Sequence, residues 1–437
     1  MSDAIGSLYA DHVRTLRERH DRALAATAFD HLIIESGFQR YQFLDDMPYP
    51  FKVNPHFKAW VPVVDNPHSF LVYTPGRTPL LLFHQPVDYW HKVPEAPSGF
   101  WVEHFEIRPI ASPDEARRHF PASGRVATIG ESESDGGEGR NPEALLNRLH
   151  FDRTIKTEYE IECMRRANLL GARGHVAAEK AFRDGASEYE IHLAYLAAAN
   201  HTEDELPYGN IIALDEHSAT LHYYAHDRRR KKARSFLIDA GASCNGYASD
   251  ITRTYAASDG LFAELVAAMD AMQQSLAAEV RPKMNYIDFH LLAYRKVAEI
   301  LVRFGIVREL DAGAVVDRRI SSAFFPHGIG HYIGLQVHDV AGFMKDPSGA
   351  TIPRPEGHPY LRLTRVVDAG HVFTIEPGLY FIDPLLAELR ASGNAKYVDW
   401  EKVDALRPCG GIRIEDDVVV REGGVENLTR AAFAHVS

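Results

Sequence analysis

Residues 236–255, FLIDAGASCNGYASDITRTY, contain two aspartates whose spacing is suited to binding a cation. Strand-like runs flank the Asn-Gly dipeptide at 245–246, which is typical of a two-residue type I′ hairpin. Counting back from that turn places Asp239 opposite Thr252 and makes Asp250 its diagonal neighbour on the same face. Diagonal neighbours lie about 7–8 Å apart, so the two carboxylates could reach one ion. Two aspartates on a solvated sheet face are an equally simple alternative.

A second group consists of three histidines in FFPHGIGHYIGLQVHD, residues 324–339: His327, His331 and His338. Three glycines in this segment argue against a continuous helix, so the first two histidines do not form a helical zinc pair. The HExxH motif is also excluded, because no glutamate follows His327. Taken alone, these histidines could equally be surface or core residues.

Two glutamates follow in strand-like segments. Glu376 ends the apolar run of VFTIEPGLY, residues 372–380, and the proline after it interrupts a sheet ladder. In GGIRIEDDVVV, residues 410–420, strand alternation places Arg413 and Glu415 on one face. A buried carboxylate needs a partner, which a simple salt bridge could supply in either case.

The combination is more informative than any single motif. It supplies four carboxylates and one imidazole, each on a strand or a glycine-rich turn: Asp239, Asp250, His331, Glu376 and Glu415. Oxygen-rich sites with one nitrogen suit Mn²⁺, Co²⁺ or Zn²⁺. Four carboxylates balance two divalent cations, and two metals about 3.5–4 Å apart can activate water and stabilise an oxyanion. Metal-assisted hydrolysis is therefore the chemical hypothesis.

The surrounding pattern predicts an N-terminal domain over 1–155 that combines a long first helix with strands. Apolar runs alternate with polar stretches, which favours an α/β fold; the runs lie at 32–36, 70–74, 79–83 and 125–130. The acidic, glycine-rich segment 131–141 predicts a loop.

Residues 156–437 predict an α+β domain with helices packed on a mostly antiparallel sheet. Thr157 and Ser187 are candidate helix caps, further helices are expected near 258–279 and 285–305, and strands are expected to dominate from about 366. The basic run 228–234 is interpreted as a solvated loop.

Composition excludes several classes of protein. With 437 residues the chain allows one to three domains, and its net charge of -12 argues against a general nucleic-acid-binding surface. Its three cysteines, Cys163, Cys244 and Cys409, lie far apart in the sequence, which argues against a disulfide framework or a thiolate zinc site. No apolar leader and no run of roughly 20 apolar residues is evident, so a cytoplasmic location is expected.

The motifs IDAG…SDITRTY, PHGIGHYIGLQVHD, TIEPGLY and GIRIEDD resemble those of the pita-bread metallopeptidases of family M24, which include methionine aminopeptidase, aminopeptidase P and prolidase. The resemblance implies a creatinase-like N-terminal α/β domain followed by a pita-bread catalytic domain. It makes Asp239 and Asp250 metal ligands, with Asp250 bridging two metals. His331 and Glu376 would bind one metal, and Glu415 would bridge.

The same resemblance implies a mechanism in which a metal-bridging hydroxide attacks the scissile carbonyl. Glu376 corresponds to a proton shuttle, and His327 and His338 correspond to histidines that handle substrate and the tetrahedral intermediate. His222 matches another substrate-contacting histidine, although an ordinary half-buried strand residue is the alternative.

Within this group, the pattern LR-x-x-R at Arg362 and Arg365 resembles that of prolidases, where the first arginine binds the free carboxylate after proline. The N-terminal segment RYQFLDDMPYPFKVNPHFKAWVPV resembles bacterial prolidases that include the organophosphorus acid anhydrolases. Asp45 corresponds there to a residue supplied by the neighbouring subunit of a dimer. The substrate contacts that the resemblance implies are Asp45, Tyr208, His222, Val337, Leu361, Arg362 and Arg413.

The resulting expectation is a homodimeric, cytoplasmic Xaa-Pro dipeptidase with two divalent ions, foremost Mn²⁺, with Co²⁺ or Zn²⁺ as alternatives. Side activity on organophosphorus esters and fluorides follows from the subgroup, and neither nucleic acid nor membrane is expected as a partner. An aminopeptidase P acting on longer Xaa-Pro peptides is the main alternative. The intact five-ligand set argues against a metal-free creatinase-type enzyme and against a non-catalytic binding module.

Overall fold

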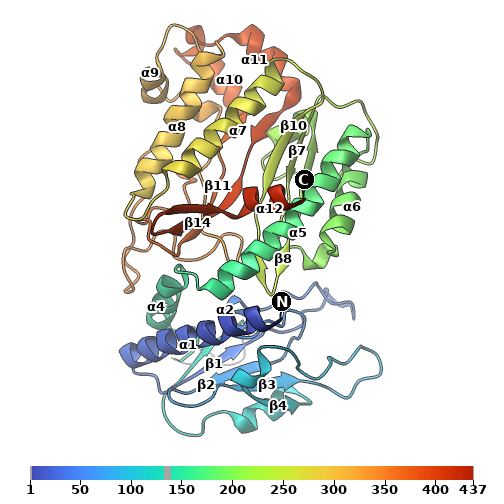
Figure 1. The fold of residues 1–437 in the computed structure, drawn as a ribbon, viewed down its shortest axis with the longest axis vertical. Coiled ribbons are helices and arrows are strands. Elements are labelled where there is room, and N and C mark those ends of the chain that lie inside the picture. Colours follow the sequence, from blue (N-terminus) through green and yellow to red (C-terminus); the bar gives the residue numbers. More distant parts are fainter. Residues whose placement is uncertain (1, 132–138, 437) are drawn as a thin grey trace. The chain divides into compact units, whose positions relative to one another are not determined.

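The computed structural model describes residues 2–131 and 139–436, which form two compact units (Figure 1). One unit comprises Met1–Cys163 with the short segments Cys244–Tyr247 and Met344–Ala350. The other comprises Met164–Ser243, Ala248–Phe343 and Thr351–Ser437. The loop predicted at 131–141 falls mainly on residues 132–138, outside the described part of the chain.

The N-terminal unit is built on a five-stranded mixed sheet in the order β4-β3-β2-β1-β5. The β1–β5 and β3–β4 pairs are parallel, and the β1–β2 and β2–β3 pairs are antiparallel. This confirms the predicted α/β character. The elements are α1 (Ser2–Thr27), β1 (His31–Glu35), α2 (Pro55–Trp60), β2 (Phe70–Tyr73), β3 (Leu80–His84), β4 (Glu106–Ile110), α3 (Pro113–Ala116), β5 (Val126–Ile129) and α4 (Glu143–Arg153).

The helices that follow begin largely where their caps predict. Glu160 and Thr157 form reciprocal side chain–backbone hydrogen bonds at the start of α5, and Ser187 and Glu190 form a capping box at the start of α6. The helices are α5 (Glu158–Arg183), α6 (Glu188–Ala199), α7 (Leu261–Glu279), α8 (Tyr286–Arg303), α9 (Ala312–Asp317), α10 (Asp383–Ala391), α11 (Trp400–Leu406) and α12 (Leu428–Val436).

The strands of the second unit pair in antiparallel ladders, in the orders β10-β7-β6, β11-β14-β15 and β12-β13. Strands β8 and β9, which include the two ends of the Cys244–Tyr247 segment, pair with each other. The strands are β6 (Ile211–Leu214), β7 (Ser235–Asp239), β8 (Ser243–Cys244), β9 (Tyr247–Ala248), β10 (Thr252–Ala256), β11 (Val372–Ile375), β12 (Gly378–Tyr380), β13 (Gly411–Arg413), β14 (Asp416–Arg421) and β15 (Gly424–Asn427). The antiparallel prediction is confirmed, although the strands form several short ladders.

The predicted hairpin register is also confirmed. Asn245 and Gly246 have φ angles of 50° and 84°, as a type I′ turn requires. Asp239 lies opposite Thr252 in the β7–β10 ladder, so Asp250 follows as its diagonal neighbour. One two-residue turn thus sets the spacing of two candidate ligands.

Helices α7 and α8 pack against each other, and α7 also contacts β10 and β11 (Figure 1). Their apolar faces form one large core with the strands that lead to the site. The prediction that strands dominate after residue 366 was wrong, because α10, α11 and α12 occur there. The segment DPLLAELRA places a proline in the first turn of α10 and buries Leu386 and Leu389, three residues apart, which is helical spacing.

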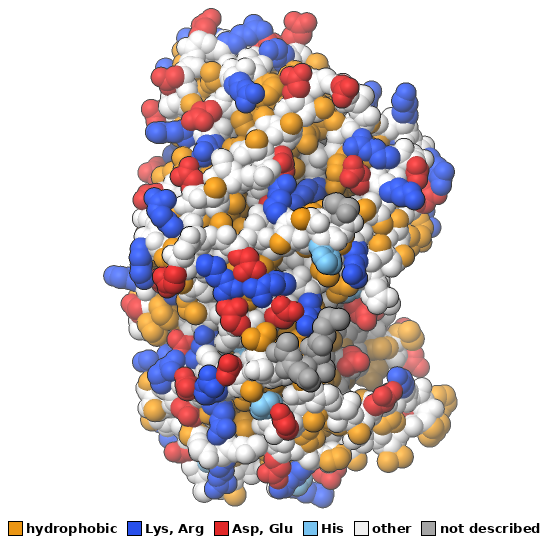
Figure 2. Space-filling view, viewed as in Figure 1, with side chains coloured by type: hydrophobic (Ala, Val, Ile, Leu, Met, Phe, Trp, Pro, Cys, Tyr) orange, Lys and Arg blue, Asp and Glu red, His pale blue; other side chains and the backbone are white. Residues whose placement is uncertain are grey.

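The basic run lies in an irregular segment between η4 (Asp215–Ala219) and β7, as predicted. Several of its cations face acidic partners: Arg229 pairs with Asp227, Arg230 with Glu190, and Lys231 with Asp215. Figure 2 shows acidic and basic side chains interspersed over one face of the molecule. Among the helices that the structure describes, none has the length and hydropathy needed to cross a membrane.

Candidate metal centre

The five predicted ligands lie where strands begin or end. Asp239 is the last residue of β7, and Asp250 lies two residues before β10. Glu376 follows β11 directly, and Glu415 directly precedes β14. His331 lies in the glycine-rich segment, which is joined to β11 because the Thr374 amide donates to the His331 carbonyl at 2.9 Å. Strand ends therefore bring together side chains that are up to 176 positions apart (Asp239 to Glu415).

Asp250, His331 and Glu415 each offer a ligand atom within 4.8 Å of the others. His331 Nε2 lies 3.4 Å from Asp250 Oδ2 and 3.8 Å from Glu376 Oε1. Its Nδ1 lies 3.0 Å from the Tyr332 carbonyl, which fixes that nitrogen as a donor. Nε2 is therefore the nitrogen directed at the carboxylates, an orientation typical of a metal-binding histidine.

Asp239 joins this group through shared partners. The Tyr208 hydroxyl lies 2.8 Å from Asp239 Oδ1 and 2.6 Å from Asp250 Oδ1, and it can donate its single proton to only one of them at a time. Arg413 Nη2 donates to Asp239 Oδ2 at 2.6 Å. The structure thus brings all five predicted ligands into one cluster.

The cluster concentrates negative charge in a buried place. Burial first, and then neighbouring carboxylates, raise the pKa of Glu376 to about 7 and hold the pKa of Glu415 well above its usual range. Burial also raises the pKa of Asp250. Burial opposes protonation of His331, but the hydrogen bond to Asp250 and the charge of Glu376 outweigh it and raise its pKa to about 9. Without cations the site holds protons, and a set of four carboxylates and one imidazole suits divalent ions that replace them.

His327 lies beside the cluster in a fixed tautomer. Its Nδ1 donates to the Gly328 carbonyl at 2.8 Å, so its Nε2 accepts from the Tyr380 hydroxyl at 2.8 Å. The same hydroxyl accepts from Arg413 Nη1 at 2.9 Å. Burial and the charge of Arg413 lower the pKa of His327 to about 3, so the imidazole is neutral.

The remaining predicted residues of this unit lie near the histidines. The His338 ring centre is 4.4 Å from that of His331. Burial first, and then His331, Arg362 and His222, lower the pKa of His338 to about 3. A Cβ on Gly328 would lie 3.0 Å from the Leu361 Cα, so the backbone of the LR-x-x-R segment packs against the histidine turn. Leu361 is buried, Val337 is half-buried, and Arg362, His222 and His338 are exposed.

Asp45 belongs to the N-terminal unit and is exposed. Its Oδ1 accepts hydrogen bonds from the amides of Asp46 and Met47 at 2.7 and 3.2 Å, which fixes the carboxylate in a turn. Its role at the site of a neighbouring subunit stays a prediction.

Several contacts around the ligands were not predicted from the sequence. The Thr252 hydroxyl donates to Glu415 Oε2 at 2.7 Å, and the Asp250 amide donates to Asp417 Oδ2 at 3.1 Å. The predicted pairing of Thr252 with Asp239 could have singled out Thr252, whereas the tertiary contact of Asp417 left no signal in the sequence. Cys163 and Cys244, which are far apart in the sequence, are in contact in the structure. A hydrogen bond with the Cys244 thiol, together with burial, raises the pKa of Cys163.

Family models match both parts of the chain. Residues 7–151 match the Xaa-Pro dipeptidase N-terminal domain, and residues 162–422 match metallopeptidase family M24. The chain is 53% identical over 434 residues to a Xaa-Pro dipeptidase of Stenotrophomonas maltophilia (strain K279a), with 98% of each chain covered. It is 53% identical over 436 residues to a Xaa-Pro dipeptidase of Xanthomonas oryzae pv. oryzae (strain MAFF 311018), with 99% of each covered.

Solved structures share the fold at low identity. The aminopeptidase PepP of Pseudomonas aeruginosa superposes with a TM-score of 0.70 at 22% identity, and 98% of each chain is covered. Zinc-substituted aminopeptidase P of Escherichia coli, in complex with product, superposes with a TM-score of 0.63 at 20% identity, covering 96% of this chain and 99% of that chain. The pita-bread fold predicted for the C-terminal half is confirmed, and the chain belongs to metallopeptidase family M24.

Proposed function

We propose that this protein is a dinuclear Xaa-Pro dipeptidase. The observation that carries the proposal is the convergence of four carboxylates and His331 Nε2, in a place where burial raises the pKa of Asp250, Glu376 and Glu415. Similarity over the full chain to proteins named Xaa-Pro dipeptidase supports the substrate class.

The five proposed ligands are Asp239, Asp250, His331, Glu376 and Glu415, with Mn²⁺ as the preferred metal and Co²⁺ or Zn²⁺ as alternatives. Two bound divalent cations would supply a water of lowered pKa and stabilise the oxyanion of the attacked carbonyl. The protein's own groups then bind and orient the dipeptide. Glu376, whose Oε2 lies 3.6 Å from His327 Nδ1, would also accept and return a proton during hydrolysis.

The histidines and Arg362 are proposed to contact the substrate. Neutral His327 and His338 would handle the substrate and the tetrahedral intermediate, and His222 would contact the substrate beside them. Arg362, exposed next to the histidine turn, would bind the free carboxylate after proline by charge-assisted hydrogen bonds. Tyr208, Val337, Leu361 and Arg413 would line the pocket.

Hydrolysis of Ala-Pro, compared with Ala-Pro-Ala, tests the proposal. A dipeptidase should cleave Ala-Pro and leave the tripeptide largely intact, whereas the alternative, an aminopeptidase P, should prefer the tripeptide. Metal analysis of the purified protein should find about two divalent ions per chain. A protein that hydrolyses neither peptide after loading with Mn²⁺ would contradict the proposed activity.

We extend the proposal to two further properties that rest on the subgroup resemblance. Hydrolysis of a phosphotriester is expected as a side activity, because a centre that stabilises a tetrahedral oxyanion at carbon can do so at phosphorus. A homodimer is also expected, in which Asp45 approaches the neighbouring subunit's site. The expected location is the cytoplasm. Sedimentation of the native protein tests whether it is a dimer. The kinetics of Asp45→Ala test whether Asp45 contributes to the site of the neighbouring subunit.

A further inference from the structure

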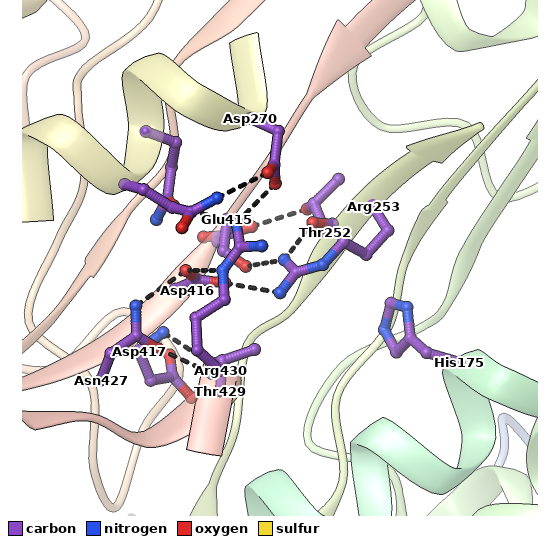
Figure 3. Close-up of polar contacts among 12 residues, drawn as sticks. His175, Thr252, Arg253, Asp270, Glu415, Asp416, Asp417, Asn427, Thr429 and Arg430 are labelled. Atoms are coloured by element: carbon purple, nitrogen blue, oxygen red, sulfur yellow. Dashed lines mark hydrogen bonds and ion pairs between the residues drawn. The ribbon is translucent and has the colours of Figure 1, made fainter. Parts of the chain in front are cut away.

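A cluster of polar residues lies at the start of the C-terminal helix α12 (Figure 3). It contacts β14, the strand that follows Glu415. Asn427 Nδ2 and Arg430 Nε both donate to Asp416 Oδ2 at 2.8 Å. The Thr429 hydroxyl accepts from the Asp417 amide at 2.9 Å. We call Asn427, Thr429 and Arg430 the C-terminal clamp, because they hold the first two residues of β14.

One branch runs from the clamp to the backbone beside two proposed ligands. Arg253 Nη2 donates to Asp416 Oδ1 at 2.7 Å, so Asp416 lies between two arginines (Figure 3). Arg253 Nη1 donates to the carbonyls of Thr252 and Glu415 at 2.9 and 2.8 Å. Asp416 and Arg253 therefore tie the backbone of Glu415 to β10, which begins two residues after Asp250.

A second branch reaches the strand that carries Glu376. Arg430 Nη2 donates to Asp270 Oδ1 at 2.7 Å and to Gln273 Oε1 at 3.1 Å, both on α7. Gln273 is fully buried, and its Nε2 donates to the carbonyl of Ile375 at 3.2 Å. Ile375 is the last residue of β11 and directly precedes Glu376.

A third branch reaches the amide of Asp250. The Thr429 hydroxyl donates to Asn168 Oδ1 at 2.7 Å, and Asn168 Nδ2 donates to Asp417 Oδ2 at 2.8 Å. The same Asp417 oxygen accepts from the Asp250 amide at 3.1 Å. The clamp thus connects through buried and partly buried hydrogen bonds to the backbone at or beside three ligands: Asp250, Glu376 and Glu415.

We propose that the C-terminal clamp, with Arg430 at its centre, is a positioning element that sets the spacing of the metal ligands. The inference rests on the proposed metal-binding function. The carboxylates of the site repel one another, so their strand ends must be held by contacts on the protein side. Residues that orient ligands in this indirect way typically contribute 10–100-fold to metal affinity.

The test measures the Mn²⁺ dissociation constant of metal-free protein by competition with a chelating dye. Arg430→Met keeps a similar length and removes every donated hydrogen bond, so its affinity should fall about 10–100-fold. Arg430→Lys, which keeps the charge and one donor, should recover part of the loss. Arg390→Met is the matched control, because Arg390 forms an exposed pair with Asp404 at 2.8 Å in the same unit. Its affinity should equal that of the native protein.

Hydrogen exchange of the metal-free protein separates positioning from general stability. Gln273→Leu cuts only the branch to Ile375, so amide exchange should increase at 372–376 and stay unchanged at 411–417. The Mn²⁺ affinity of Gln273→Leu should also fall. If Arg430→Met does not fold, Gln273→Leu alone tests the positioning role. Native affinity in Arg430→Met or Gln273→Leu would overturn the positioning role while leaving the metal site intact. A native protein that binds no Mn²⁺ would instead overturn the proposed function, and this inference with it.

Discussion

Glu415 and Asp416 are neighbours in the sequence and are both buried, yet their environments are opposite. On the ligand side, burial and then three other carboxylates hold the pKa of Glu415 well above its usual range. On the clamp side, burial alone would raise the pKa of Asp416, but Arg253 and then Arg430 lower it. One side of the strand therefore concentrates negative charge, and the other pairs it with arginines.

The difference shows which buried carboxylates are neutralised by other residues of the chain and which need bound protons or cations. At Asp416 the chain itself supplies the cations, so Arg253 and Arg430 neutralise this carboxylate on folding. The ligand side lacks cations of its own beyond Arg413 and a protonated His331, and it becomes neutral when protons or divalent ions bind. A buried carboxylate that the chain leaves uncompensated marks function, whereas a compensated one marks structure.

Glu415→Gln is expected to have the largest effect on activity and little effect on folding. The amide cannot bridge two cations, so hydrolysis of Ala-Pro should be lost, and Asp250→Asn should behave in the same way. The metal-free variant should melt at the native temperature or above it, because an amide avoids the cost of burying an ionisable carboxyl whose pKa is raised in the folded state. Asp404→Asn, in an exposed pair, is the control for both measurements. Native turnover by Glu415→Gln would refute the ligand assignment.

Asp416→Asn is expected to have the opposite profile. It leaves buried Arg253 facing a neutral group, and breaking such a buried pair costs about 3–5 kcal/mol of unfolding free energy, whereas half-buried Arg430 keeps Asp270 as a partner. Urea unfolding of the metal-free protein, compared with Glu415→Gln, measures this cost. Equal stability of the two variants would contradict the claim that Asp416 stabilises the fold and Glu415 does not.

Arginines show the same contrast on a smaller scale. Arg253 is buried against Asp416, whereas Arg362 is exposed and is proposed to bind a carboxylate supplied by the substrate. Arg362→Ala should raise KM for Ala-Pro by roughly 10–100-fold, since a hydrogen bond to a charged group contributes about 1.5–3 kcal/mol. Hydrolysis of a phosphotriester, which has no such carboxylate, should change little. An unchanged KM for Ala-Pro would remove Arg362 from the substrate site.

The ligand side was more predictable from sequence than the clamp side. The Asn-Gly turn and period-two counting predicted that Asp239 and Asp250 share a face, because hairpin register is a local property. The gathering of His331, Glu376 and Glu415 around them followed from the combination of residue types and from the family resemblance. The coarse α/β and α+β division was predictable for the same reason, since both follow from local periodicity.

The clamp could not be predicted, because its contacts join distant segments. Arg430 meets Asp270 and Gln273 only after α12 packs near α7, and no local pattern encodes that packing. The helices after residue 366 were missed because they are short, with 9, 7 and 9 residues for α10, α11 and α12, and a short apolar run does not distinguish a helix from a strand. The cysteine contact was missed because Cys163 and Cys244 are 81 positions apart.

A pH dependence of stability is expected in the metal-free protein. The pKa of Glu376 is about 7 in the folded protein, above its ordinary value of 4.5. Between these values the folded state holds a proton that unfolding releases, so stability should fall as pH rises from about 4.5 to 7. Glu376→Gln should flatten this slope, measured as melting temperature against pH without metal, whereas Asp404→Asn should keep it. Bound Mn²⁺ should reverse the slope, because metal binding requires the ionised carboxylate. Equal slopes in native protein and Glu376→Gln would show that the ligand side does not hold this proton.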